Sequence, residues 1–336
     1  MSIATNAAEP LGRRGASLDR AIVIGLAMLM VLVLAGSLLV PGFLSVQNTR
    51  SILLLAAFLG IASLGQTLVA LLGALDLSIP YVIGAANILL PAMMVAGLPP
   101  AAAIAVVAAL GLACGMVNGL LSYRLQGQAL IMSLGFGFAV VGAAQIWTSI
   151  GSQFGGTVFA QIPGWLRNLA AFNGTTFGLP VPPVIPIWIG IAIIAIWGMG
   201  NTWFGRGVYA LGGSRVAASR LQISELRTWI LVHGISGLMS AITGMLLLGF
   251  SGGGFVGVGD PYLFTTVAAV VIGGTSLLGG SGGYGATVLG VLVLTVLTSL
   301  LVGLGLSFAA QQAVIGLTIV PMVAIYARAP HIRNQI

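Results

Sequence analysis

The stretch Ser51–Leu72, SILLLAAFLGIASLGQTLVALL, runs for 22 residues without an Asp, Glu, Lys, Arg or His. A helix needs about 20 apolar residues to cross the hydrocarbon core of a bilayer, because each residue adds about 1.5 Å. A helix also satisfies its backbone hydrogen bonds within its own segment, as lipid requires. Ser51–Leu72 therefore predicts a membrane-spanning helix.

The rest of the chain repeats this pattern. Of its 336 residues, 58% are hydrophobic and 5% are charged, whereas a soluble domain carries about 25% charged residues. We expect an all-α, polytopic transmembrane helix bundle of about ten spans. The predicted spans are Ala21–Val40, Ser51–Leu72, Pro80–Leu98, Ala101–Leu121, Ala129–Ile150, Val184–Trp203, Thr228–Phe250, Leu263–Leu278, Ala286–Leu306 and Ala309–Ala327. The eighth is short and flanked by glycines, so a broken or re-entrant segment is the alternative to a full span.

The basic residues, all 12 of them arginines, are unevenly distributed over such a bundle. If ten spans alternate and the N-terminus is cytoplasmic, most arginines fall on the cytoplasmic side. These are Arg13, Arg14, Arg20, Arg124, Arg206, Arg215, Arg220, Arg227, Arg328 and Arg333. Only Arg50 and Arg167 fall outside, so the positive-inside rule predicts that both termini are cytoplasmic. The net charge of +7 is thus explained by orientation and does not indicate nucleic-acid binding.

This topology divides the chain into three parts. We expect a disordered cytoplasmic tail at 1–20, a transmembrane domain at 21–327 and a second cytoplasmic tail at 328–336. Within the domain, the outer loop 151–183 is periplasmic, and the inner loop 205–227 carries four arginines and Glu225. Neither loop is long enough to contain a separate enzyme domain.

The predicted spans hold almost no charged residues, which argues against ion-coupled transport and against an intramembrane enzyme. The chain also lacks a Walker A pattern, so it does not hydrolyse ATP itself. Its buried amides and hydroxyls suit a neutral, hydroxyl-rich solute. We select Gln66, Asn87 and Asn118 as candidates for a solute pathway, with tying helices together as the alternative. Asp76 is a further candidate, whose alternative role is to cap the helix that begins near Pro80.

The inner loop contains a second candidate region. Tyr209–Ile223 reads YALGGSRVAASRLQI, in which two turn glycines precede Ser214, a suitable N-cap for a short helix. Val216, Ala217 and Leu221 can share one face of that helix, which would then dock in a groove of a cytoplasmic partner. The alternative is a solvated loop that carries orienting arginines.

Three segments resemble a known family. They are Ser63–Val69 (SLGQTLV) with Leu75–Ser78 (LDLS), Gly115–Leu121 (GMVNGLL) and Gly259–Gly280 (GDPYLFTTVAAVVIGGTSLLGG). These segments are similar to motifs of the ribose- and xylose-type permeases of ATP-binding-cassette (ABC) sugar importers. The most specific family-motif residues are Gly273, Gly274, Thr275, Ser276, Gly279 and Gly280.

The resemblance implies that the inner loop couples the chain to an ATPase. The residues to which it assigns this role are Ala210, Leu211, Gly212, Gly213, Ser214, Ala217, Ala218, Leu221 and Ile223. Val216 and Gln222 depart from the family pattern, which usually has Glu and Gly at these positions. The detailed docking contacts of the family are therefore not carried over.

The resemblance also implies a function: the permease subunit of a bacterial inner-membrane importer for a sugar or a similar neutral polyol. The implied partners are ATP-binding subunits, a periplasmic sugar-binding protein and a second permease, identical or related. This chain would bind no cofactor and catalyse no reaction, because the partner ATPase uses ATP and Mg²⁺. The alternative is a secondary transporter or facilitator that works without ATP.

Overall fold

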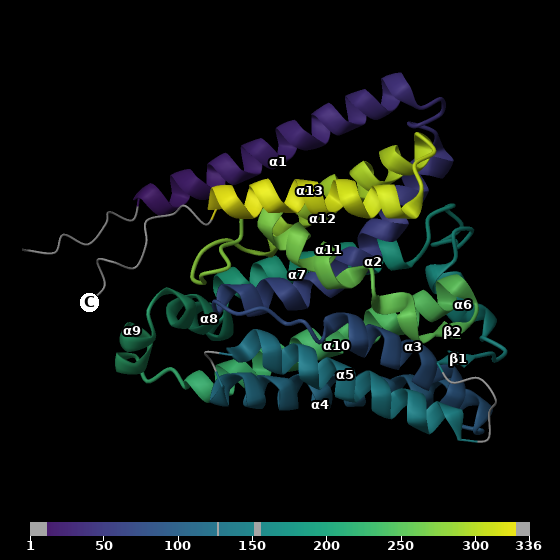
Figure 1. Cartoon of the computed structure of the whole chain (residues 1–336), viewed down its shortest axis with the longest axis horizontal. Helices are drawn as coiled ribbons and strands as arrows, with labels where there is room; N and C mark the ends of the chain where they lie inside the picture. Colours follow the sequence, from purple (N-terminus) through teal and green to yellow (C-terminus); the bar gives the residue numbers. More distant parts are fainter. Residues whose placement is uncertain (1–11, 126–127, 151–155, 327–336) are drawn as a thin grey trace, which may run out of the picture.

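A computed structural model describes residues 12–125, 128–150 and 156–326. Its long helices run side by side along one axis (Figure 1). The helices are α1 (Gly12–Leu39), α2 (Val46–Leu71), α3 (Ile79–Val95), α4 (Pro100–Arg124), α5 (Ala129–Ser149), α6 (Gly164–Ala170), α7 (Val184–Asn201), α8 (Trp203–Gly213), α9 (Arg215–Arg220), α10 (Glu225–Ser251), α11 (Tyr262–Ile272), α12 (Tyr284–Gly303) and α13 (Phe308–Tyr326). Strands β1 (Thr157–Val158) and β2 (Gly254–Phe255) pair antiparallel, and the short 3-10 helix η2 (Val256–Gly259) follows β2.

Each of the ten predicted stretches contains a helix, namely α1 to α5, α7 and α10 to α13. Within the described ranges, seven of these helices are long and apolar enough to cross a membrane. Helix α11, in the eighth predicted stretch, has 11 residues. It therefore covers about 16 Å, roughly half of the hydrocarbon core, so this segment is short as predicted.

Two predicted loop regions are more helical than the sequence indicates. α1 begins at Gly12, so residues 12–20 of the predicted disordered tail are helical, and this part of the prediction is wrong. A spanning helix can continue into water because its hydrogen bonds are internal. Most of the inner loop is likewise helical, as α8 and α9. Residues 1–11 and the predicted tail 328–336 lie outside the described residues.

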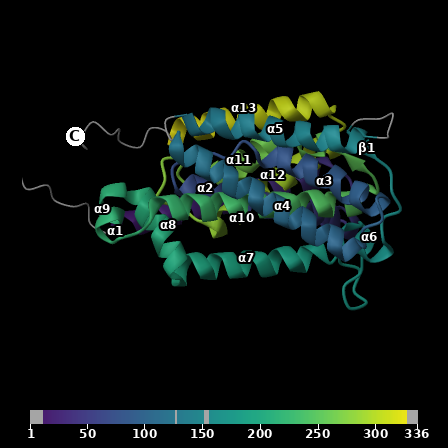
Figure 2. The ribbon, with the colours of Figure 1, turned by 90° about the horizontal axis from the view of Figure 1, so that it is seen from below.

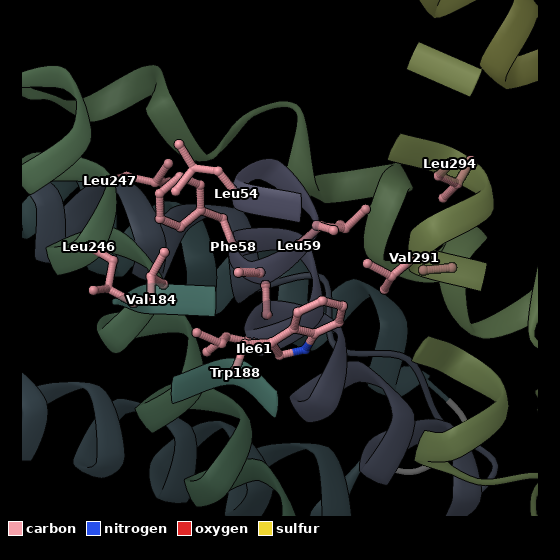
Figure 3. Packing of buried hydrophobic residues seen from close by; sticks show 14 of the residues in the cluster. Leu54, Phe58, Leu59, Ile61, Val184, Trp188, Leu246, Leu247, Val291 and Leu294 are labelled. Carbon is pink, nitrogen blue, oxygen red and sulfur yellow. The ribbon is translucent and has the colours of Figure 1, made fainter. Parts of the chain in front are cut away.

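Helix α2 is the centre of the bundle. In its apolar window, 89% of the residues are buried, against 11% in that of α1. Figure 3 shows Phe58 and Ile61 of α2 in one cluster with Trp188 of α7, Leu247 of α10 and Val291 of α12. The apolar stretch Ser51–Leu72, which predicts a membrane span, thus forms most of the helix that the other helices surround.

Small residues let neighbouring helices approach closely. In lipid, helices associate through packing and hydrogen bonds because lipid chains are as apolar as the side chains. Between α4 and α10, a Cβ added at Gly237 would lie 2.8 Å from Gly115 Cα, and one added at Gly111 would lie 2.8 Å from Gly237 O. Only glycine permits this backbone separation at these positions.

The bundle has two different ends. α8 and α9 lie at one end, and α6, β1 and β2 lie at the other (Figures 1 and 2). α1 begins and α13 ends at the α8–α9 end (Figure 1). The exposed arginines are Arg206 of α8, Arg215 and Arg220 of α9 and Arg227 in the first turn of α10, whereas Arg167 belongs to α6. Positive charge therefore gathers at the end where the described chain starts and stops.

Candidate functional site

The unit formed by α8 and α9 projects from one end of the bundle. α8 buries Val208 and Leu211 in a cluster that includes the end of α2. Ser214 begins α9 and accepts a hydrogen bond at Oγ from the N–H of Ala217, with a distance of 3.3 Å. The predicted helix cap is confirmed, so this part of the inner loop is not an irregular solvated loop.

One face of α9 and its C-terminal turn is apolar and exposed. Val216 is 66% exposed and Leu221 is 69% exposed, and Ala217 is exposed between them. Ala218 is fully buried against the bundle, and Ile223 is half-buried behind it. The unit therefore has an inner side that holds it to the membrane helices and an outer side that is open to a partner.

The inner side of α8 rests directly on backbone atoms. A Cβ added at Gly212 would lie 2.7 Å from Gly280 N and even closer to Leu71 O. The N–H of Gly280 in turn donates to Leu71 O at 2.9 Å. Tyr209 lies about one helical turn before Gly212 on α8, and its hydroxyl donates to Gly282 O at 2.9 Å. Burial raises the pKa of this phenol. The end of α2, the end of α8 and the turn after α11 thus meet at one point.

The family-motif glycines form the turn that joins α11 to α12. Gly274, Gly279 and Gly280 have φ values of 77°, 91° and 70°, in the left-handed region that glycine adopts without strain. At Gly273, an added Cβ would lie 2.6 Å from the carbonyl carbon of Ala286. Each of the four glycines therefore has a backbone reason to be glycine.

The two hydroxyl residues of the motif hold this turn together. Thr275 accepts at Oγ1 from the N–H of Gly283 at 3.1 Å, and Ser276 accepts at Oγ from the N–H of Leu278 at 3.1 Å. Thr275 is buried. The motif thus builds a fixed turn against which α8 packs.

Asp76 lies at the centre of a buried polar network between α2 and α3. Its Oδ1 accepts from Ser78 N at 3.0 Å, Ser78 Oγ at 2.6 Å and Asn118 Nδ2 at 3.1 Å. Its Oδ2 accepts from Ser236 Oγ at 2.7 Å. Ser78 precedes α3 and its own side chain makes no capping bond, whereas Asp76 accepts from the N–H of Ser78, in keeping with the capping alternative for Asp76. The network also ties the loop after α2 to α4 and α10.

The other two predicted pathway residues differ from each other. Asn87 donates at Nδ2 to Gly244 O at 2.9 Å and accepts at Oδ1 from Phe255 N at 2.7 Å, so it links α3 to α10 and β2. Gln66 is fully buried, yet neither its amide nitrogen nor its amide oxygen has a hydrogen-bond partner in the described part of the chain. The hydroxyl of Ser63, one turn earlier on α2, is also unpartnered there.

Sequence reasoning missed Ser236, the α10 partner of Asp76. The available signal was a polar face on an apolar span, because Trp229, His233, Ser236, Ser240 and Thr243 recur every three or four residues. All five are buried. Across the described ranges, no group of three or more His, Cys, Asp or Glu side chains could hold a metal ion.

Comparisons with known proteins match most of the chain. The family described as Branched-chain amino acid transport system / permease component matches residues 48–323. The chain is 33% identical over 296 residues to the probable ABC transporter permease protein YphD of Escherichia coli (88% of this chain, 86% of the relative). It is 31% identical over 298 residues to the ribose import permease protein RbsC of Bacillus subtilis (87% and 88%). It is 32% identical over 238 residues to the autoinducer 2 import system permease protein LsrD of Photorhabdus luminescens (70% of each).

Proposed function

Because the chain belongs to the Branched-chain amino acid transport system / permease component family, we propose that it is the membrane permease subunit of a bacterial ABC importer for a sugar or similar neutral polyol. The named relatives import ribose and autoinducer 2, which supports a sugar-like cargo over an amino acid. A neutral solute needs no buried countercharge, in keeping with the scarcity of charge in the spans. The chain is a multi-pass membrane protein, and its relatives are named as permease proteins. In the proposed importer, a partner subunit hydrolyses the ATP.

The α8–α9 end is the cytoplasmic end in this proposal. The positive-inside rule supports it, because the exposed arginines of α8, α9 and their flanks lie there. The start of α1 and the end of α13 lie at the same end (Figure 1). Ten crossings, with both termini in the cytoplasm, account for this arrangement.

The contact of Gly212 with Leu71 and Gly280 is the observation that carries the coupling role. We assign the exposed Val216 and Leu221 to the surface that docks in the ATPase, which binds ATP and Mg²⁺. When the ATPase moves α9, α8 must push on the end of α2 and on the turn after α11. Packed backbone atoms cannot absorb the displacement as a flexible side chain would, so motion reaches the centre of the bundle.

Gln66 is the pathway residue that we retain. Its amide has no partner in the described chain, so it can exchange hydrogen bonds with a hydroxyl or water without breaking existing ones. Asp76, Asn87 and Asn118 would first have to give up internal hydrogen bonds. We therefore assign these three a structural role in holding α3, α4 and α10 together.

Reconstitution tests the proposal. The permease, its ATPase and its sugar-binding protein are placed in proteoliposomes, and uptake of the sugar that stabilises the binding protein is measured. The expected result is uptake that requires ATP, the binding protein and an ATPase with an intact Walker A lysine. Uptake by this chain alone, driven by an ion gradient, would establish the secondary-transporter alternative instead.

A further inference from the structure

The loop between α6 and α7 contains a tight hairpin whose tip residue, Phe177, is fully exposed. Thr176 and Leu179 form an antiparallel bridge, with N–H to O distances of 3.0 and 2.9 Å in the two directions. Phe177 and Gly178 have φ values of 49° and 82°, as in a type I′ turn. Asn or Asp commonly precedes the glycine in such turns, and a bulky side chain with positive φ is an outlier. The backbone therefore holds Phe177 in a disfavoured conformation, with the residue fully exposed.

The hairpin is fixed by contacts on both sides. Thr176 donates from Oγ1 to Val181 O at 2.7 Å. The N–H of Thr175 donates to Oδ1 of Asn168 in α6 at 3.3 Å. Pro180 follows the bridge and restricts the chain further. The exposed ring thus occupies a defined place relative to α6 and α7.

The chemistry of the hairpin suits lipid. Residues 173–183, NGTTFGLPVPP, contain no ionisable group. Beside Phe177, Leu179 is 63% exposed and Val181 is 37% exposed. An aromatic tip with neutral neighbours matches the boundary between lipid headgroups and acyl chains.

The position of the hairpin suits the same boundary. α7 has 18 residues, so it is about 27 Å long, close to the thickness of the hydrocarbon core. The middle of α7 exposes Ile193 and Ile194, Trp197 is exposed near its far end, and Trp203 is exposed just beyond that end, as the first residue of α8. The loop that contains the hairpin projects from the bundle beside the near end of α7, at Val184 (Figure 2). Aromatic side chains thus mark both ends of one lipid-facing helix.

We propose that the Thr176–Leu179 hairpin is a membrane-interface anchor, which inserts Phe177 between the headgroups and acyl chains of the leaflet at the α6 end. The anchor fixes the depth of α7 and ties the α6 end to the bilayer surface. It requires only that α7 faces lipid, so it does not depend on the cargo or on the ATPase.

Site-specific labelling tests the anchor in the full chain. In a Cys114→Ala background, which removes the single cysteine, a fluorophore sensitive to water is attached at Phe177→Cys in lipid nanodiscs. Lipids carrying a nitroxide near the headgroup and aqueous iodide serve as quenchers. Ile193→Cys is the lipid-facing reference, and Ser219→Cys on α9 is the aqueous reference, since both positions are exposed.

The expected result at position 177 is strong quenching by the shallow nitroxide lipid and weak quenching by iodide. A label on Thr175→Cys should lose its lipid quenching when Phe177→Asn is added, because Asn suits the turn but does not enter lipid. Iodide quenching equal to that at Ser219, or protection that appears only when the soluble binding protein is added, would overturn the anchor. A lack of lipid quenching at Ile193 would instead contradict the membrane placement of α7, which separates the two failures.

Discussion

Gly212 and Gly213, neighbours at the end of α8, offer a matched test of whether α8 moves the bundle. A Cβ added at Gly212 would lie 2.7 Å from Gly280 N and 3.0 Å from the carbonyl carbon of Leu71. A Cβ added at Gly213 would have no atom within 4 Å. Both substitutions to Ala bring a similar gain in helix propensity, of at most about 1 kcal/mol. Any difference between them therefore comes from the contact.

The size of the perturbation follows from the distances. Non-bonded heavy atoms pack best about 3.5–4 Å apart, and Leu71 O is the atom closest to the added Cβ, so Gly212→Ala must separate α8 from Leu71 by roughly 1.5–2 Å and from Gly280 by about 1 Å. Overpacking of this kind costs about 1–3 kcal/mol. The separation also strains the hydrogen bond from Gly280 N to Leu71 O. We expect Gly212→Ala to lower the melting temperature and to reduce solute uptake far more than ATP hydrolysis.

The assay is the ratio of solute imported to ATP hydrolysed in proteoliposomes, with co-purification of the ATPase as a docking control. Gly213→Ala should match the wild type in both, and Ala217→Glu should lose the ATPase by placing a charge on the exposed face of α9. A wild-type ratio for Gly212→Ala, or an equal fall for Gly213→Ala, would refute the route through α8.

Four further substitutions test the buried residues and the α9 turn by thermal unfolding and hydrogen exchange. Asp76→Ala removes the acceptor of four buried hydrogen bonds and should cost about 2–4 kcal/mol, whereas Ala at the exposed Asp260 should change stability little; equal losses would argue against the network. Asn87→Leu should cost about 2 kcal/mol because the buried Gly244 carbonyl and the part-buried Phe255 N–H each lose a partner, while Gln66→Leu should leave the melting temperature unchanged or higher. If the stable Gln66→Leu variant still imports solute at the wild-type rate, Gln66 is not part of the solute pathway. Gln222 has a φ of 57°, so Gln222→Gly should stabilise the turn by about 1 kcal/mol and slow amide exchange at residues 214–224; faster exchange would contradict this.

Local features of the fold were predictable from the sequence. The apolar run Ser51–Leu72 predicts α2, because span length and hydrophobicity are properties of one segment. Its start at Val46 was missed, although Ser45 carries the signal: its Oγ accepts from Asn48 N at 3.2 Å and caps the helix. The cap at Ser214 was predictable for the same local reason.

Contacts between distant segments were not predictable. Asp76 and Ser236 are 160 residues apart, and their hydrogen bond depends on how α10 packs against the loop after α2. The sequence placed both in or beside spans but could not pair them. Gln222 was predictable in part. The family that the sequence resembles usually has Gly at this position, and the positive φ of Gln222 in the structure explains why Gly is preferred there.

The glycine-rich motif forms the joint between α8 and the bundle. The residues that determine which solute is transported must therefore lie outside this motif. An added Cβ at Gly279 would lie 2.9 Å from both Gly73 N and Gly212 O, so three segments far apart in the sequence touch through backbone atoms. A joint of this kind depends on spacing and is indifferent to what crosses the membrane. A change of sugar should therefore leave these glycines in place, whereas a change of ATPase should act on the exposed Val216 and Leu221 of the α9 face.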